Sequence, residues 1–416
     1  MNFISSHYVC FTLFFKFFKI IKSTIFNTKQ HFKNQKQMKK IVSFFALALI
    51  LTACNGSTKK EISIENTSKF DYSNKVISIT WERLKENYPW VDKDNFKIVN
   101  AKSNAEIPYQ IEYLGTEKPV NLLLQVSLKS NEKMQLSCIQ EKPSTFTTKT
   151  YARFVPERFD DFAWENDIIA FRMYGKALEL EAKGNAFGMD VWVKRTDRMV
   201  LNERYKRGKY HEDNGDGMDY YHVGFTLGAG NCAPFVNDSI WYSKNYSKWN
   251  ILDNGPLRTT FKLDFDPWDV AGNLISATKT ISLDAGSQLN KIEVTYSTDA
   301  AIETIPVAMG IIKRPEEGGI EMFNTGKGIL GYWEPTHGND GTTGVGVIIP
   351  SKVDDMRLRN DQYLAIAEMP VNKSFAYYAG AAWDKAGVIT TNKQWFDFLE
   401  LQNEQLAKDG IVVNFK

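Results

Sequence analysis

The stretch LRTTFKLDFDPWDVAGNLISATKTISLDAGSQLNKIEVTYST, residues 257–298, contains three runs in which β-branched and aromatic residues alternate with polar ones. Residues with turn-forming tendencies (Gly, Asn, Asp and Pro) separate the runs. Alternation with a period of two is typical of strands with one buried face. The stretch therefore predicts consecutive β-strands joined by short turns.

The same pattern recurs over most of the chain. Further runs of this kind are VNLLLQVSLKS, EKMQLSCIQEK, DIIAFRMYG, GMDVWVKR, TIPVAMGIIKR, GVGVIIP and SFAYYAGAAW. Clear helical periodicity is confined to residues 392–410, where Trp395, Phe396 and Leu399 form an apolar stripe. The sequence predicts an all-β fold of stacked antiparallel sheets with a short C-terminal helix.

The N-terminus has the features of an export signal. Lys39 and Lys40 precede the apolar run IVSFFALALILTA, which ends at Cys54 in a lipoprotein cleavage pattern. We expect residues 1–53 to be an upstream extension plus signal peptide and Cys54 to carry the lipid. The mature protein would be anchored in the outer membrane, facing the periplasm or the cell surface.

Composition then divides the mature chain. Residues 54–71 are polar and predict a tether, residues 72–148 a small β-rich region, and residues 149–416 the main β-sandwich with the catalytic groups. The boundary near 148 is soft, since strands of the first region could complete a sheet of the second.

Charge argues against nucleic acid as a partner. The first 53 residues carry eight lysines and no acidic residue, so the net charge of +2 for the whole chain becomes −6 for residues 54–416. Residues 194–209 are a basic exception. Within them Arg195 and Arg207 could bind an anionic ligand, although a solvated strand-and-turn face would explain the same charges. Cys138 and Cys232 could form a disulfide or remain free thiols.

Residues 153–175, RFVPERFDDFAWENDIIAFRMYG, mix charged and aromatic side chains. Trp164, Glu165 and Asn166 could contact a sugar, and Arg172 and Tyr174 share one face of an expected strand. This pair could line a cleft, or Arg172 could form a buried ion pair with Glu165 or Asp167.

Residues 209–235, KYHEDNGDGMDYYHVGFTLGAGNCAPF, combine titratable groups with glycines. A hairpin would bring His211 back toward His222. In the strand-like part, Tyr220 and His222 share one face, and Asp219 and Tyr221 share the other.

A third polar cluster, residues 331–346, is GYWEPTHGNDGTTGVG. Trp333 could stack on a pyranose ring, and His337 could bind the substrate. The glycines form no dinucleotide-binding motif, and the sequence identifies no cofactor with certainty. A divalent metal held by His211, His222, His337 and Asp219 is an open alternative.

Two blocks of residues carry a family resemblance. RFVPER, DDFAWEND and AFRMYG within residues 153–175, together with YHEDNGDGMDYYHVG and LGAGNCAPF, resemble the exported Bacteroidota proteins grouped as domain of unknown function 4861. The sheet-rich pattern also resembles the supersandwich of galactose mutarotase and several polysaccharide lyases. The resemblance extends to enzymes that dehydrate ulvan oligosaccharides, and it implies an anionic uronic-acid oligosaccharide as substrate, processed in sequence with other enzymes of one degradation pathway.

The implied reaction removes water across C4 and C5 of a terminal uronic acid. It requires a base for the C5 proton, an acid for the leaving hydroxyl and a cation to offset the carboxylate. The chemistry favours His222 as base and Tyr220 or Tyr221 as acid, with His211 nearby. Arg172 or the basic run 194–209 could supply the cation, with Asn166 as a neutral donor. The alternatives are a polysaccharide lyase, a glycoside hydrolase and a sugar-binding lipoprotein without catalysis.

Overall fold

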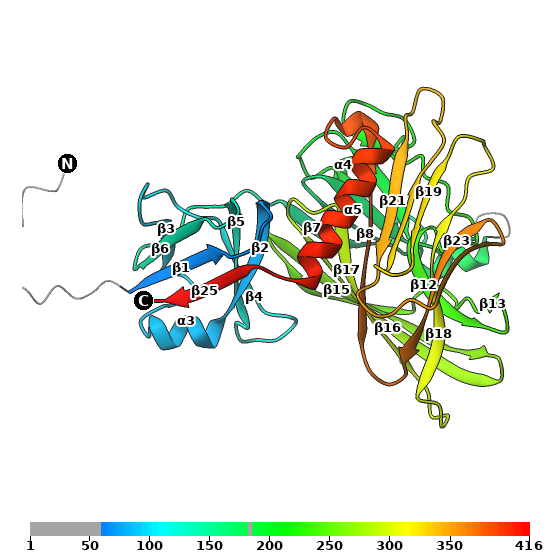
Figure 1. The fold of residues 1–416 in the computed structure, drawn as a ribbon, viewed down its shortest axis with the longest axis horizontal. Coiled ribbons are helices and arrows are strands. Elements are labelled where there is room, and N and C mark those ends of the chain that lie inside the picture. Colours follow the sequence, from blue (N-terminus) through cyan, green and yellow to red (C-terminus); the bar gives the residue numbers. More distant parts are fainter. Residues whose placement is uncertain (1–59, 182–184) are drawn as a thin grey trace, which may run out of the picture. The chain divides into compact units, whose positions relative to one another are not determined.

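The computed structural model describes residues 60–181 and 185–416, which contain five antiparallel sheets (Figure 1). The fold class expected from the sequence is confirmed. The expected signal peptide, the expected lipidation site Cys54 and the first part of the expected tether lie outside the described residues. Among the helices that are described, none combines the length and apolar character needed to cross a membrane.

The N-terminal part is a small two-sheet sandwich. One sheet has the order β25-β1-β6-β3 and the other β2-β5-β4. Their strands are β1 (Glu61–Asn66), β2 (Tyr72–Thr80), β3 (Lys97–Asn100), β4 (Tyr109–Glu112), β5 (Asn121–Leu128), β6 (Lys133–Ile139) and β25 (Ile411–Phe415). Helix α3 (Trp81–Asn87) inserts Leu84 into the core that Phe96, Leu122 and Leu124 share.

This sandwich corrects two expected boundaries. Residues 61–66 are strand β1 and not tether, because Ile62 and Ile64 alternate with polar residues and are fully buried. Strand β25, assigned from the sequence to the main region, pairs with β1 from Ile62↔Phe415 to Asn66↔Ile411. The N-terminal sandwich is therefore completed by the end of the chain.

The main part stacks one wide sheet against two narrower ones. The wide sheet has the order β14-β15-β16-β17-β24-β21-β20-β19. Its strands are β14 (Lys248–Asn254), β15 (Arg258–Val270), β16 (Asn273–Asp284), β17 (Leu289–Ser297), β19 (Ile320–Asn324), β20 (Ile329–Trp333), β21 (Thr343–Ile348) and β24 (Phe375–Trp383). The alternating stretch that predicts the fold supplies β15, β16 and β17.

The two narrower sheets have five strands each. The first, β11-β10-β9-β8-β7, contains β7 (Thr150–Val155), β8 (Asp161–Asn166), β9 (Ile169–Met173), β10 (Asp190–Lys194) and β11 (Gly217–Met218). The second, β13-β12-β18-β23-β22, contains β12 (Ala229–Val236), β13 (Ser239–Ile240), β18 (Thr304–Ile312), β22 (Asp355–Arg359) and β23 (Gln362–Pro370). Residues from both sheets and from the wide sheet share one apolar core.

Helices cover the remaining sheet faces. Helix α5 (Asn392–Ala407) lies along β20 and β21, where Trp395 and Leu399 are fully buried (Figure 1). A Cβ at Gly346 would lie 2.6 Å from a Leu399 methyl group, so glycine is required for this close packing. Helix α4 (Leu201–Arg207) covers the outer face of the first five-stranded sheet, and short 3-10 turns occur at Lys176–Leu180 and Asp384–Ala386.

Cys138 and Cys232 are free and buried, in β6 and β12 respectively. Of the two alternatives, the free thiols are the arrangement in the structure. Burial raises the pKa of Cys138 to about 12, as expected for a thiol in apolar surroundings.

Candidate functional site

Arg172 lies inside the protein and does not face a cleft. Its guanidinium group is 2.5 Å from Asp190, 3.1 Å from Asp219 and 3.5 Å from Asp161, and about 4% of the residue is exposed. Burial raises the pKa of Asp161 to about 6, and burial also raises the pKa of Asp190 and Asp219. A buried ion pair of Arg172 is one of the two arrangements that the sequence predicts. Its partners are these three aspartates, and not the expected Glu165 or Asp167.

Strand β8 is also internal. Trp164, Glu165 and Asn166 are completely buried, so none can contact a sugar in this structure. The carboxylate of Glu165 accepts hydrogen bonds from the Lys194 ammonium group and from the backbone N–H groups of Val200 and Leu201 at the start of α4. The expectation that these three residues contact the substrate is therefore wrong, and they stabilise the sheet and helix α4 instead.

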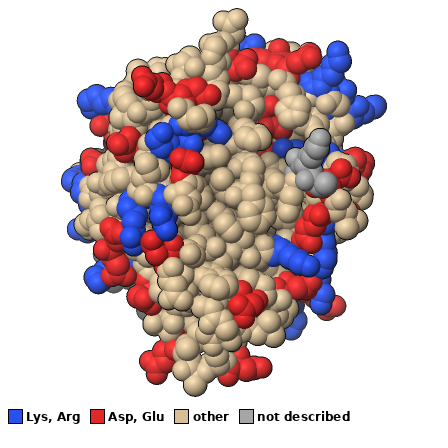
Figure 2. Space-filling model, turned by 90° about the vertical axis from the view of Figure 1, so that its right-hand side faces the viewer, with Lys and Arg blue, Asp and Glu red and all other residues tan. Residues whose placement is uncertain are grey.

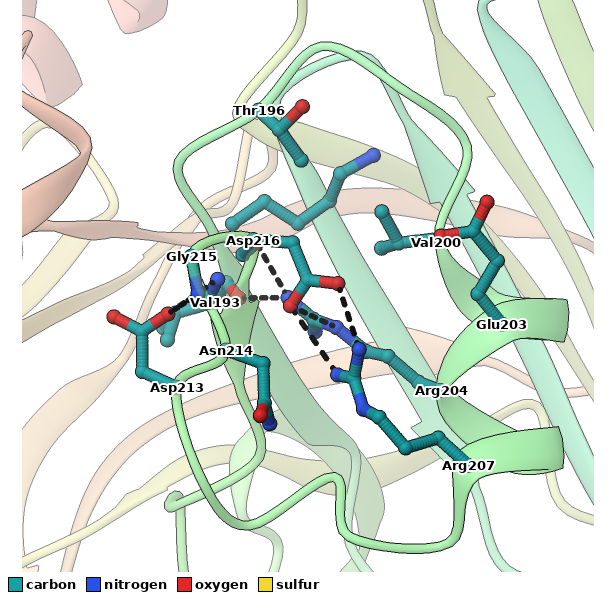
Figure 3. A network of polar contacts seen from close by, with 12 residues as sticks. Val193, Thr196, Val200, Glu203, Arg204, Arg207, Asp213, Asn214, Gly215 and Asp216 are labelled. Atoms are coloured by element: carbon teal, nitrogen blue, oxygen red, sulfur yellow. Dashed lines mark hydrogen bonds and ion pairs between the residues drawn. The ribbon is translucent and has the colours of Figure 1, made fainter.

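The basic run 194–209 is largely neutralised by neighbouring acids. Figure 3 shows Arg204 and Arg207 reaching from α4 to Asp216 in the loop before β11. Arg204 is fully buried and donates to the carbonyl groups of Val193 and Asp216, and Arg207 pairs with the Asp216 carboxylate at 3.3 Å. Arg195 likewise pairs with Asp213 at 2.8 Å. These contacts fasten the loop, which differs from the expected role of Arg195 and Arg207 in binding an anion.

The segment after β11 alternates between interior and surface. Asp219 and Tyr221 point inward, Tyr220 is half-buried and His222 is exposed. Tyr221 donates to the Gly228 carbonyl group and is almost fully buried, so it cannot serve as the acid. His211 projects into solvent with Nδ1 2.7 Å from the Asp219 carbonyl oxygen.

Five residues from three segments come together at the edge of the sandwich, and we name them the Arg314 site: Tyr220, His222, Arg314, Glu334 and His337. Arg314 follows β18 and donates to Glu334 Oε1 at 2.5 Å and to the His222 carbonyl oxygen at 2.5 Å. Its guanidinium group also lies 4.3 Å from the centre of the Tyr221 ring. Arg314 thus fixes both the β20 end and the 219–224 segment.

Three polar atoms in this site are buried without a hydrogen-bond partner among the described residues. They are Arg314 Nη2, Glu334 Oε2 and His337 Nε2. Glu334 Oε2 lies 3.7 Å from His337 Nε2, which leaves Nδ1 as the imidazole nitrogen that can meet a substrate. Unpaired buried polar groups are costly, and they therefore commonly mark places where a ligand or water binds.

Tyr220 completes the arrangement. Its ring meets the His337 ring edge-on at 5.5 Å, and its hydroxyl group lies 2.6 Å from Thr343 Oγ1 at the start of β21. Burial raises the pKa of Tyr220 well above its ordinary value, so the phenol keeps its proton at neutral pH.

The electrostatics of the acid and the imidazole are complementary. Burial raises the pKa of Glu334 to about 7, even though the Arg314 charge opposes this. Burial lowers the pKa of His337, with the Arg314 charge acting in the same direction. Both shifts favour the uncharged forms, a protonated carboxyl group beside a neutral imidazole.

The other predicted residues do not join this cluster. Trp333 is only 9% exposed and packs with Trp395 and Leu399 beneath α5, so it offers no open ring to a sugar. Within residues 60–181 and 185–416, no three His, Cys, Asp or Glu side chains are placed to hold a metal ion. The set of His211, His222, His337 and Asp219 is thus not assembled: His211 lies beside Asp219, and His337 lies beside Glu334.

A cavity of about 510 Å³ lies away from this site, between the N-terminal sandwich and β14. Its polar groups are already occupied. Asp253 accepts from the N–H groups of Tyr113 and Leu114, and Gln110 binds the backbone at Leu257 and Arg258. The cavity therefore lacks the unpaired groups that distinguish the Arg314 site.

The chain is similar over most of its length to a bacterial protein. It is 28% identical over 389 residues to the uncharacterised protein P7 of Formosa agariphila, covering 87% of this chain and 96% of that protein.

Two solved structures show weak similarity to this chain. An alpha-mannosidase from Enterococcus faecalis V583 is 9% identical with a TM-score of 0.49, covering 86% of this chain and 46% of that one. A protein of glycosyl hydrolase family 38 from Enterococcus faecalis is also 9% identical, with a TM-score of 0.48 and coverages of 86% and 47%. The chain spans less than half the length of either structure.

The model of one protein family matches residues 64–411, which include every strand from β2 to β24 and all five residues of the Arg314 site. The chain therefore belongs to the family of domain of unknown function DUF4861.

Proposed function

We propose that the protein is a dehydratase that removes water across C4 and C5 of a uronic acid at the non-reducing end of ulvan-type oligosaccharides. The observation that carries the proposal is the Glu334–His337 contact beside Arg314, with Tyr220 against the same imidazole. A base, an acid and a cation are the three groups that this elimination requires.

Arg314 takes the role of the cation. Its Nη2 atom has no partner among the described residues and can bind the sugar carboxylate, which would offset the second negative charge that develops as the C5 proton leaves. Arg172 cannot do this, since three aspartates surround its guanidinium group.

His337 is the better candidate for the base. Of the two imidazoles in the site, His337 has an acidic group beside it, with Glu334 Oε2 3.7 Å from its Nε2. Its lowered pKa leaves the ring unprotonated and able to accept a proton. Its Nδ1 removes the C5 proton, and Glu334 balances the resulting charge. His222, which sequence analysis favours as the base, is exposed and is assigned to binding the substrate.

Tyr220 is the acid. The phenol gives its proton to the C4 oxygen, the C4–O bond breaks, and the C5–H electron pair becomes the C4=C5 double bond. The products are one water molecule and an unsaturated sugar. The Thr343 hydroxyl group can donate to the phenolate that remains, until a proton returns from His337.

The test uses the full chain with ulvan oligosaccharides that carry saturated uronic ends. We expect the product to lose the mass of one water molecule and to gain absorbance in the near ultraviolet, without chain shortening. Shorter unsaturated products would instead indicate a polysaccharide lyase, and shorter saturated products a glycoside hydrolase. Binding without any product would indicate a sugar-binding protein.

A further inference from the structure

Three aromatic residues form a cluster next to the Arg314 site. Phe225, three residues after His222, is 53% exposed and lies 4.8 Å from the Tyr242 ring. Phe187 stands edge-on to Tyr242 at 5.2 Å and is almost fully buried. The buried ring supports two more exposed ones, and we name Phe187, Phe225 and Tyr242 the aromatic platform.

Hydrogen bonds hold this platform in place. Gln362 donates to the Tyr242 hydroxyl group at 2.9 Å and accepts from the Leu227 N–H group at 2.7 Å. The Phe187 N–H group donates to the Gly224 carbonyl oxygen at 3.4 Å. Because these bonds already fix the rings, a ligand that stacks on them loses little further conformational freedom.

The short segment from His222 to Phe225 joins the platform to the Arg314 site. The His222 imidazole bends back over Gly224, since its Nε2 lies 3.7 Å from the place where a Cβ of Gly224 would be. Gly224 has a φ of +56°, a conformation that favours glycine, and it turns the chain between His222 and Phe225. A ligand that contacts the exposed His222 ring therefore lies close to the exposed Phe225 ring.

The apolar residues around the platform favour the uncharged C–H face of a sugar ring. Phe187 and Tyr242 pack with Leu227, Ala233 and Phe235 on the β13-β12-β18-β23-β22 sheet. Figure 2 shows the face that contains this sheet, with a broad uncharged area in its middle and charged residues around the rim. The apolar C–H face of a pyranose can stack on such rings, whereas a carboxylate would lose hydration there.

We infer that the aromatic platform stacks on the C–H face of the sugar ring that follows the terminal uronic acid, and so makes the protein selective for oligosaccharides over free uronic acids. The inference rests on the proposed function, because it places the acidic sugar at Arg314. It adds a second subsite and the kind of ring that occupies it.

The test compares wild type, Phe225→Ala and Phe159→Ala, all as full chains. Phe159 is a matched control, because it is 41% exposed and lies in the turn between β7 and β8. Binding of saturated ulvan di- and tetrasaccharides is measured by calorimetric titration, and product formation is followed separately. We expect Phe225→Ala to weaken tetrasaccharide binding about tenfold, as loss of one aromatic contact predicts, and Phe159→Ala to leave it unchanged.

The outcomes separate the two proposals. Dehydration with equal tetrasaccharide affinity in wild type and Phe225→Ala would overturn the platform and leave the proposed reaction in place. Affinity that depends on Phe225 without any unsaturated product would support the platform and overturn the reaction. Equal weakening by Phe159→Ala would also overturn the platform, since the effect would then not be local.

Discussion

Glu334 and His337 face each other in a buried space, with Oε2 of the acid 3.7 Å from Nε2 of the imidazole. Arg314 holds the other carboxylate oxygen at 2.5 Å. The three side chains come from the end of β18 and from the loop after β20, so two strands of different sheets must be in place before the site exists.

The first prediction distinguishes the two imidazoles. His337→Ala should lower kcat by about 10²- to 10⁴-fold, because a positioned proton acceptor contributes this much. His222→Ala should mainly raise KM, since its exposed ring is assigned to substrate binding. Steady-state kinetics by near-ultraviolet absorbance measures both. Asn339→Ala in the same loop is the control, and a loss of kcat confined to His222→Ala would return the role of base to His222.

The second prediction concerns pH and Glu334. Its pKa is raised from 4.5 to about 7 by burial, so the folded protein binds this proton more tightly than the unfolded chain. The resulting stabilisation is fully present below pH 4.5 and is lost as the pH rises to about 7. Glu334→Gln cannot titrate.

The free energy of unfolding of wild type, relative to Glu334→Gln, should therefore fall by on the order of 3 kcal/mol across this range. Denaturant unfolding at a series of pH values measures the difference. Glu404→Gln, a variant of a surface carboxylate, serves as control. A difference that stays constant with pH would contradict the assigned titration.

The third prediction concerns the buried charges around Arg172. Arg172→Met leaves Asp161, Asp190 and Asp219 without their cation and should reduce the free energy of unfolding by about 3–5 kcal/mol. Arg198→Met removes an exposed pair with Glu203 and should cost no more than about 1 kcal/mol. Chemical denaturation compares the two variants, and wild-type stability in Arg172→Met would show that the aspartates are neutral in the folded protein.

The fourth prediction concerns strand β25. Deleting residues 411–416 removes the partner of β1 along one edge, so the amide groups that face β25, those of Glu61, Ser63 and Glu65, should lose protection in hydrogen exchange. Amides of β16, in the middle of the wide sheet, should keep theirs. Equal loss in β1 and β16 would mean that the two sandwiches unfold together.

The sheet content could be predicted from the sequence because its physical signal is local. In β16, buried Ile275, Ala277, Ile281 and Leu283 share one face of the strand, and this period of two can be read directly. The helix at Asn392–Ala407 has an equally local signal in Trp395 and Leu399. Strand β1 carries the same alternation in EISIEN, but the polar residues around its two isoleucines predict a tether.

The site was harder to predict because it is formed by contacts between residues that are far apart in the sequence. Glu165 in β8 and Lys194 in β10 lie in stretches from which the sequence predicts ligand contacts, yet the two side chains neutralise each other inside the protein. Arg314 stands in the polar stretch KRPEEGG, and nothing local distinguishes it from a surface arginine. Tyr220, His222 and His337 could be selected as rare titratable groups in glycine-rich segments, although their common neighbour could not.

The pairing of β1 with β25 has a consequence for synthesis of the protein. The ribosome makes Ile411–Phe415 only after the whole main sandwich, so the nascent chain carries β1 with one unpaired edge until then. Bare strand edges recruit strands of other molecules. Messages that stop before residue 411 should therefore yield self-associating products, even though every residue of the Arg314 site has been made.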